Sequence, residues 1–296
     1  MISAATKTVL SGLATMRSAN CSWPWHTAPP INFVRAMKIP ILASLIVILA
    51  ANASPPVGEA AFDQGMKEMA SKDWDKALDS FETALTADPD NVRYGSEYRR
   101  AAILRAQDIH GKEGKGEDFD RPIAFFGRLV AKNPADANAY LNYGLAYVDK
   151  IPVVDTISRI GVANSALTQL SKSIELRPSW VGYYTRGTNY LFWPKFFDRA
   201  KLGVADLETA VKMQKAGPSK PYYAHAYVAL GDGYWKTDQL EKARSAWSEG
   251  LKEFPDSAAL QERLSKQGDD LKVLIQDTMD FKKRVDTNLK NLWLYP

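Results

Sequence analysis

The residues in this chain that could carry acid–base or nucleophilic chemistry are few, and their spacing fits no catalytic pattern. After residue 53 there are two histidines, His110 and His225, and no cysteine, since the single cysteine is Cys21. The patterns HExxH, CxxC and GxSxG do not occur in the sequence. The ligand sets of zinc hydrolases and the nucleophiles of serine hydrolases are therefore missing. We expect no enzymatic activity, no cofactor and no metal site.

Phosphate and nucleic-acid binding are also not indicated. The glycine-rich stretch at 110–118 lacks the GxxxxGK[ST] spacing of a phosphate-binding loop and is typical of a solvated loop. The formal net charge of +4 comes from four cations within residues 1–53, and the remaining chain has 34 basic and 34 acidic side chains. A nucleic-acid binder needs a basic face to offset phosphate charge. We therefore expect no nucleic-acid partner.

An export signal is predicted near the N-terminus. From Met37 the sequence reads MKIPILASLIVILAANAS, which is a Met-Lys start, an apolar run and the small residues Ala51-Asn52-Ala53. This is the order of a secretory signal peptide, and the run is shorter than the roughly 20 residues that span a bilayer. We expect residues 37–53 to be the signal and the chain after it to be periplasmic. Residues 1–36 have no helical period, and we expect them to be untranslated or disordered.

Two segments far apart in the chain share one spacing of small residues, an aromatic residue and proline. The first set is Ala77, Phe81, Ala84 and Pro89, and the second, at the same intervals, is Ala243, Trp247, Gly250 and Pro255. A glycine precedes each set by twelve residues, at Gly65 and Gly231. Small residues let two antiparallel helices approach closely, and the proline ends the second helix. The spacing therefore predicts packed helix hairpins.

This spacing resembles the tetratricopeptide repeat (TPR), a helix hairpin of about 34 residues. We count five units between residues 58 and 257, of which the first and the fifth match best and the second, 92–134, matches least. One hairpin cannot bury its own apolar face, so copies must stack. The resemblance implies an all-α, right-handed superhelical solenoid of about five TPR hairpins over residues 54–257. Capping helices and a tail would follow over residues 258–296.

The repeat is lengthened in its middle units. The spacings Pro89 to Pro134 and Pro134 to Pro178 are 45 and 44 residues. In the third unit, apolar residues at helical spacing predict a second helix that begins near Asp155-Thr156 and overhangs the solenoid. The addition in the fourth unit is aromatic and contains Trp193, Phe196 and Phe197. We expect these additions to share one edge of the superhelix, where the aromatic residues cover the overhanging helix, bind a partner, or both.

In the TPR family, ligands usually lie in the concave groove that the first helices of the hairpins form. By register, the groove positions are Asn138, Leu141, Leu145 and Asp149 in the third unit, Tyr184, Thr188, Leu191 and Phe192 in the fourth, and His225, Asp232, Trp235 and Lys236 in the fifth. Aromatic anchors among hydrogen-bonding groups suit an extended peptide or a partner's helix. The Lys/Asn set with which some family members bind a C-terminal carboxylate is not visible in this register.

We therefore expect a protein- or peptide-binding scaffold, an adaptor or assembly factor of the bacterial periplasm. Two other classes stay open. A membrane-surface module would rest the aromatic edge on lipid, although the lack of a basic face counts against it. A small-molecule binder or enzyme would have a pocket closed by the added segments and acids that converge in it. The apolar tail at 288–296 either packs on its own domain or is displaced by a partner.

Overall fold

The chain divides into two units, residues 1–53 and 54–296. The computed structural model describes residues 56–280, 282–283 and 285–295. The signal peptide expected at 37–53 and the upstream segment 1–36 lie outside the described residues. The regular elements of the described part are all helices. None of these described helices is long and apolar enough to cross a membrane.

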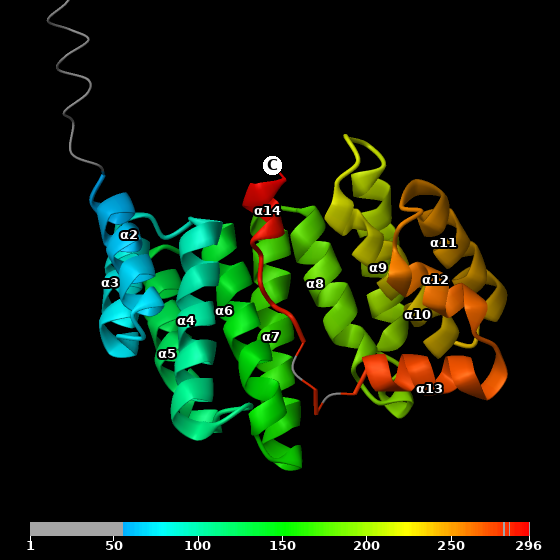
Figure 1. Ribbon diagram of the computed structural model, residues 1–296, viewed down its shortest axis with the longest axis horizontal. Helices are drawn as coiled ribbons and strands as arrows, with labels where there is room; N and C mark the ends of the chain where they lie inside the picture. Colours follow the sequence, from blue (N-terminus) through cyan, green and yellow to red (C-terminus); the bar gives the residue numbers. More distant parts are fainter. Residues whose placement is uncertain (1–55, 281, 284, 296) are drawn as a thin grey trace, which may run out of the picture. The chain divides into compact units, whose positions relative to one another are not determined.

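The helices of the described residues follow one another as antiparallel hairpins (Figure 1). Five pairs are formed by α2 (Val57–Ala70) with α3 (Trp74–Ala87), α4 (Val92–His110) with α5 (Asp120–Lys132), α6 (Ala137–Lys150) with α7 (Thr156–Leu176), α8 (Trp180–Leu191) with α9 (Ala200–Gln214), and α10 (Ala224–Lys236) with α11 (Leu240–Glu253). The C-terminal helices are α12 (Ala258–Ser265), α13 (Gly268–Thr278) and α14 (Asn291–Leu294). Short 3-10 turns lie in four connections, η1 (Gly116–Phe119), η2 (Ile151–Val153), η3 (Lys195–Phe197) and η4 (Pro221–Tyr223). The predicted all-α solenoid of helix hairpins is confirmed.

Glycine residues let the two helices of a hairpin touch. A Cβ atom added at Gly65 of α2 would lie 2.9 Å from the Phe81 ring of α3, and one added at Gly231 of α10 would lie 2.1 Å from the Trp247 ring of α11. Phe81 and Trp247 are both 0% exposed. The spacing that defines the repeat is therefore a packing requirement, because each ring of a second helix rests on the glycine of the first.

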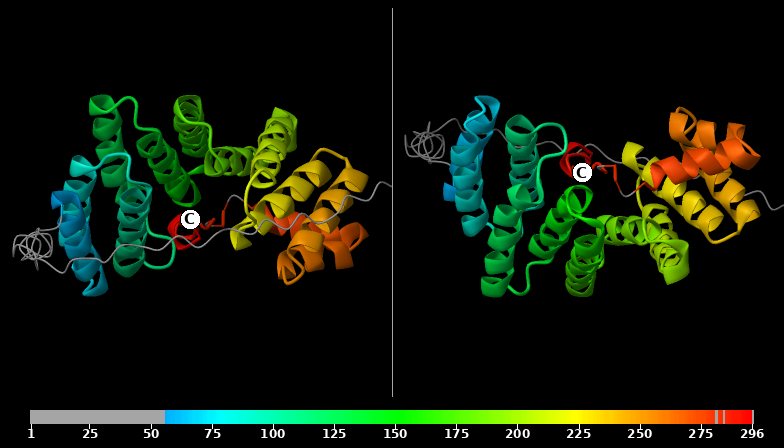
Figure 2. Two further views of the ribbon diagram at one scale, coloured as in Figure 1. Left: turned by 90° about the horizontal axis from the view of Figure 1, so that it is seen from above. Right: turned by 90° about the horizontal axis from the view of Figure 1, so that it is seen from below.

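Neighbouring hairpins are joined by aromatic side chains. The Phe62 ring of α2 stacks on Tyr94 of α4 with 4.7 Å between centroids. Within the second hairpin, the Tyr98 ring of α4 meets Phe125 of α5 edge-on at 5.3 Å. The buried apolar side chains of the described residues form three clusters along the stacked hairpins. Within residues 54–296 the helices follow an arc, and Figure 2 shows α14 on its inner side.

The start of α7 accounts for the length of the third unit. The Asp155 carboxylate accepts hydrogen bonds from the backbone N–H groups of Ile157 and Ser158, at 2.9 and 3.0 Å, which is the geometry of an N-cap. The first turns of α7 extend past their neighbours, since Ile157 is 87% exposed and a Cβ at Gly161 would meet nothing within 4 Å. The helix begins at Thr156, as the sequence predicts, and it overhangs the solenoid.

After α13 the chain turns back along the inner side of the arc (Figures 1 and 2). We call residues 285–295 the C-terminal segment. Leu289 of this segment is 7% exposed and joins a core cluster with Leu141, Leu145 and Val148 of α6. The end of the chain thus packs against helices from the middle of the solenoid rather than against α13.

Candidate functional site

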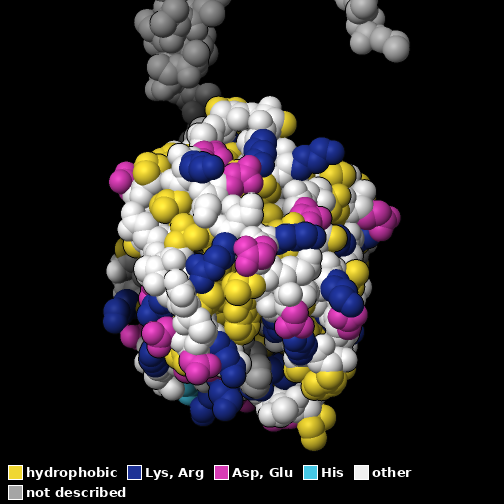
Figure 3. Space-filling model, turned by 90° about the vertical axis from the view of Figure 1, so that its right-hand side faces the viewer, with side chains coloured by type: hydrophobic (Ala, Val, Ile, Leu, Met, Phe, Trp, Pro, Cys, Tyr) yellow, Lys and Arg dark blue, Asp and Glu magenta, His cyan; other side chains and the backbone are white. Residues whose placement is uncertain are grey.

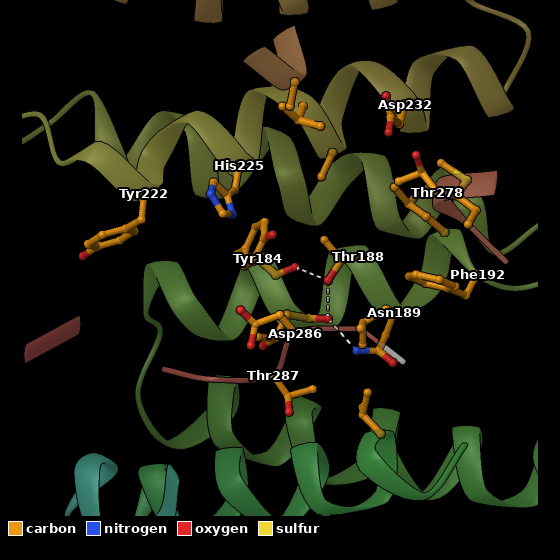
Figure 4. A pocket seen from close by; sticks show the side chains of 18 of the residues that line it. Tyr184, Thr188, Asn189, Phe192, Tyr222, His225, Asp232, Thr278, Asp286 and Thr287 are labelled. Carbon is orange, nitrogen blue, oxygen red and sulfur yellow. Dashed lines mark hydrogen bonds between the residues drawn. The ribbon is translucent and has the colours of Figure 1, made fainter. Parts of the chain in front are cut away.

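A large chamber opens on the inner side of the arc, between α8, α10 and the C-terminal segment. Its volume is about 1340 Å³, and α6, α7 and the connection after α8 also contribute to its lining. The lining is mostly apolar, and residues 285–289 and 291–292 belong to it. Figure 4 shows α8 and α10 facing each other across this space. The chamber is partly enclosed and partly open to solvent.

Stacked rings form the part of the chamber near the start of α8. Trp180 and Tyr184 are nearly parallel, with centroids 4.9 Å apart, and Tyr222 packs edge-on against Trp180 at 5.1 Å. The Trp180 indole N–H donates to Gln214 Oε1 at 2.9 Å, so α9 fixes the orientation of the ring. Held rings of this kind present apolar area to a ligand at little cost in conformational entropy.

Three polar groups meet in the same space: Tyr184 of α8, His225 of α10 and Asp286 of the C-terminal segment (Figure 4). Burial raises the pKa of Tyr184 to about 12, and the carboxylates of Asp286 and Asp232 act in the same direction. The pKa of His225 is lowered because surrounding protein atoms disfavour the imidazolium, although the Asp286 carboxylate opposes that effect. The imidazole still faces open space within the chamber. The lowered pKa favours the neutral imidazole, in which one ring nitrogen donates a hydrogen bond and the other accepts one.

Asp232 lies in the chamber wall but is already paired. Its two carboxylate oxygens accept hydrogen bonds from Nε and Nη2 of Arg263 in α12, at 2.6 and 2.7 Å, and both side chains are less than 5% exposed. Arg263 Nη2 also donates to the Thr278 hydroxyl of α13 at 3.3 Å. Asp232 therefore fastens the capping helices to α10. Among the described residues, no group of three or more His, Cys, Asp or Glu side chains could hold a metal ion.

A second polar cluster holds the C-terminal segment against α4 and α6. Arg99 Nη1 donates to Asp149 Oδ2 at 2.9 Å and to the Thr287 hydroxyl at 3.1 Å, while Nη2 donates to the Thr287 carbonyl at 2.8 Å. The Thr287 hydroxyl donates in turn to Asp149 Oδ1 at 2.5 Å, and Arg99 Nε donates to Asn142 Oδ1 at 3.1 Å. The Arg99 and Asp149 side chains are 1% and 2% exposed. This ion pair is thus buried beneath Thr287.

The backbone of the C-terminal segment is bound by the same helix. The Leu289 N–H donates to Ser96 Oγ of α4 at 3.1 Å. Together with the bond from Arg99 to the Thr287 carbonyl, this contact places two α4 side chains on the backbone on either side of Asn288. The segment is therefore bound by side chains of the groove, as a separate peptide would be.

Much of the predicted groove set lies in the chamber wall. Its members there are Leu145, Tyr184, Thr188, Leu191, Phe192, His225 and Asp232. The Thr188 hydroxyl donates to the backbone carbonyls of Tyr184 and Thr185, at 2.9 and 3.0 Å, so its hydrogen bond is satisfied within α8. Apart from Thr188 and Asp232, the polar side chains that the predicted set contributes to this wall are those of Tyr184 and His225.

Three predicted positions of the third unit do not lie on a free groove surface. Leu141 is 1% exposed and packs in the core, and Asp149 is bound by Arg99 and Thr287. Asn138 is held by Asp90, which accepts from the Asn138 backbone N–H at 2.7 Å and from its side-chain amide at 2.8 Å. In this structure Leu141 and Asp149 are not free groove surface, because the C-terminal segment covers that part of the groove. Contact between these two residues and a partner stays a prediction.

Trp235 and Lys236 line a separate pocket of about 640 Å³ at the C-terminal end of α10. Lys195 and Asp238, which form an ion pair at 2.6 Å, lie in the same pocket. The Lys236 ammonium donates to the backbone carbonyl of Leu191, and burial lowers its pKa to about 8. The predicted residues of the fifth unit therefore face two different cavities.

The aromatic edge forms part of the rim of the chamber. Trp193 is 6% exposed, and the Arg199 guanidinium lies 3.7 Å from its ring centroid. Phe196 and Phe197 pack on each other at 4.3 Å, and Phe196 is 82% exposed. Arg199 also donates to the Asn164 side chain of the overhanging helix α7 at 2.8 Å. The added segments of the third and fourth units thus meet, and all three aromatic residues line the chamber.

The sequence-based prediction missed Ser96, Arg99 and Thr287. Ser96 and Arg99 lie in the unit that matches the repeat least well, and Thr287 lies in the tail after the repeats, so the register assigns none of the three to the groove. The signal in the sequence is that Arg99 precedes Ala101 and Ala102, small residues of the kind that pack between helices, and the structure buries all three. A cation on such a face needs a buried partner. The position of that partner depends on the fold.

The glycine–aromatic pairs of the first and fifth hairpins, Gly65 with Phe81 and Gly231 with Trp247, make the same contact in the same register. The chain has the tetratricopeptide-repeat fold. Solved structures similar to it include TTC0263, a thermophilic TPR protein of Thermus thermophilus, with 20% identity, a TM-score of 0.48, and coverage of 70% of this chain and 97% of that chain. YrrB, a TPR protein with an unusual peptide-binding site, is 12% identical with a TM-score of 0.44 over 77% of this chain and 99% of that chain.

Curated relatives match shorter stretches of sequence. The Hsp70-Hsp90 organizing protein of Triticum aestivum is 27% identical over 145 residues, which are 44% of this chain and 23% of the relative. Serine/threonine-protein phosphatase 5 of Homo sapiens is 27% identical over 117 residues, which are 38% of this chain and 21% of the relative. The chain thus matches less than a quarter of the length of these relatives. No protein-family model matches the chain.

Proposed function

We propose that this chain is a protein-binding scaffold and that its chamber binds the apolar face of an amphipathic segment of a partner protein. The observation that carries the proposal is the chamber of about 1340 Å³, with its mostly apolar wall between α8 and α10. A TPR solenoid presents its first helices along a continuous inner surface. Side chains on such a surface are placed to hold a chain that runs along it.

The size of the chamber favours a peptide over a small molecule. Pockets for small ligands usually enclose about 300–1,000 Å³. An α-helix about 10 Å wide rises about 1.5 Å per residue, so a space of about 1340 Å³ holds on the order of ten residues. Because the chamber is partly open to solvent, a longer partner chain can enter and leave it.

The chemistry of the wall indicates how such a segment is recognised. Trp180, Tyr184 and Phe192 offer rings to bulky apolar side chains, and His225 offers a neutral imidazole to a polar group among them. Buried aromatic anchors with a few polar contacts are typical of binding hot spots. On the face shown in Figure 3, Lys and Arg are interspersed with Asp and Glu, so no single sign of charge dominates it. Recognition on our proposal depends on apolar anchors inside the chamber.

We place this function in the bacterial periplasm, as an adaptor or assembly factor. The signal-like segment at 37–53 supports export. A general role in bringing other proteins together also agrees with the name of the wheat relative, which describes an organizing protein. The partner on this proposal is an envelope protein or a subunit of an exported complex.

The proposal is tested by selecting peptides about twelve residues long from a displayed library and measuring their binding by fluorescence anisotropy. The variant His225→Trp places a bulkier side chain in the chamber from α10. We expect it to lower the affinity for the selected peptides at least tenfold. Leu202→Trp is the matched control, because Leu202 of α9 is 53% exposed and lies outside the chamber lining. Equal binding to both variants and the unchanged chain would refute a chamber site, and so would failure to select any peptide.

A further inference from the structure

We infer that the surface of α4 and α6 beneath the C-terminal segment is a second peptide site, for extended segments with a threonine two residues before a leucine. The chain's own Thr287 and Leu289 occupy this site in cis. A partner with the same chemistry binds by replacing them. This inference rests on the proposed function, since it extends peptide binding along the groove from the chamber to α4.

The first observation is that α4 binds the backbone of its occupant. Arg99 donates to the Thr287 carbonyl at 2.8 Å, and Ser96 accepts from the Leu289 N–H at 3.1 Å. One donor and one acceptor on α4 therefore satisfy the two peptide groups that flank Asn288. Main-chain hydrogen bonds of this kind bind an extended chain whatever its side chains are.

The second observation concerns the residue two positions before the leucine. Its side-chain oxygen must accept a hydrogen bond from Arg99 Nη1 and donate one to Asp149 Oδ1, as the Thr287 hydroxyl does at 3.1 and 2.5 Å. A hydroxyl can do both, whereas a carboxylate only accepts and an ammonium only donates. A carboxylate here would also meet the charge of Asp149. The site therefore selects threonine or its closest analogue, serine.

The third observation concerns the leucine. Leu289 is 7% exposed and packs with Leu141, Leu145 and Val148 of α6. Burying an aliphatic side chain of this size stabilises a complex, and a polar residue at this position would lose that contribution. The hydroxyl site and the apolar pocket together select a three-residue pattern: threonine, then any residue, then leucine.

The fourth observation is that the site is built around an occupant. The Arg99 and Asp149 side chains are 1% and 2% exposed. Thr287 supplies two of the acceptors for Arg99 and one of the donors for Asp149. Buried polar groups that lose their partners are costly, so these two helices require a segment with this chemistry.

A segment of another protein can replace the cis segment even though the cis segment is part of the same chain. Thr287 and Leu289 are buried, whereas Asp286 and Lys290 beside them are exposed. A tethered segment competes at an effective concentration on the order of millimolar. An outside segment therefore binds well only when it reaches that concentration or when the cis segment is weakened.

The experiment uses the full chain and a fluorescent peptide of residues 285–295 as the probe. The variant Thr287→Val/Leu289→Ser releases the cis segment and leaves α4 and α6 unchanged. We expect the probe to bind this variant at least tenfold more tightly than the unchanged chain. A peptide that carries the same two changes should not bind. Adding Ser96→Ala to the released variant should lower the affinity for the probe about two- to tenfold, because one hydrogen bond to the backbone of the probe is lost.

Circular dichroism melting shows whether the released variant is folded. If it is folded and the probe does not bind, or if the altered peptide binds as well as the probe, the inference is overturned. A second measurement needs no variant. Hydrogen exchange at 285–292 of the unchanged chain should become faster when millimolar probe peptide competes, and unchanged exchange would overturn the inference. Loss of chamber binding in His225→Trp affects neither result, so failure of the proposed function and failure of this inference are distinguishable.

Discussion

Arg99 and Thr287 lie 188 residues apart in the sequence, yet the Arg99 guanidinium binds both the hydroxyl and the carbonyl oxygen of Thr287, at 3.1 and 2.8 Å. Asp149 completes the cluster from α6. Three parts of the chain thus share one buried ion pair. The stability of the middle hairpins and the position of the C-terminal segment therefore depend on each other.

Substitution of Arg99 should be strongly destabilising. Arg99→Met leaves the Asp149 carboxylate buried without its cation, and breaking a buried pair from one side costs about 3–5 kcal/mol. Urea unfolding followed by circular dichroism measures the change in the free energy of unfolding. The double variant Arg99→Met/Asp149→Leu should recover most of the loss, because no unpaired charge remains. Equal losses in the single and double variants would contradict the account.

The contact between Gly231 and Trp247 predicts a second effect on stability. Gly231→Ala places a methyl group 2.1 Å from an indole that is 0% exposed, so α10 and α11 must move apart. We expect a loss of about 3 kcal/mol in the free energy of unfolding, at the upper end for overpacked cores. Gly161→Ala in the overhanging part of α7 is the control. Its Cβ meets nothing within 4 Å, and it should stabilise the chain by about 0.5–1 kcal/mol.

The turn between α2 and α3 offers a stabilising substitution. Lys72 has φ of +61° in that turn, a left-handed conformation that costs a residue with a Cβ about 1 kcal/mol. Its ion pair with Asp108 is exposed on both sides and adds little. We expect Lys72→Gly to raise the midpoint of thermal unfolding. Lys76, within α3, is about equally exposed. Lys76→Gly should lower the midpoint, because glycine inside a helix costs about 1 kcal/mol of stability. Changes of the same sign would contradict this prediction.

His225 predicts a pH dependence. Its folded pKa is lowered from 6.5 because the protein atoms around the chamber partly desolvate the ring, so the unfolded chain binds the proton more readily than the folded chain does. The free energy of unfolding should therefore fall as pH drops below 6.5, until the folded pKa is also passed. Titration of the imidazole by NMR measures the folded pKa directly. Asp286→Asn should lower that pKa further, because the Asp286 carboxylate favours the imidazolium. A His225 pKa at or above 6.5 would contradict the placement of the ring.

The repeat and its register are local properties of the sequence. Gly65, Phe81 and the small residues between them lie within one hairpin, so their spacing alone specifies which helix faces meet. The start of α7 was predicted for the same reason, because Asp155 caps a helix whose apolar residues follow within a few turns. The aromatic rim at Trp193 follows from the order of the hairpins, since their added segments lie side by side at one edge.

The inner surface is different, because its occupant comes from the end of the chain. By register, Tyr184 and His225 belong to the groove, and they do line the chamber. Register also assigns Asp149 to the groove, but it cannot indicate that Thr287 lies over that carboxylate. Hydrophobic spacing and helix capping act over a few turns and can be recognised along the sequence. A buried ion pair is completed by whichever segment the solenoid brings to it, and only the tertiary structure decides that.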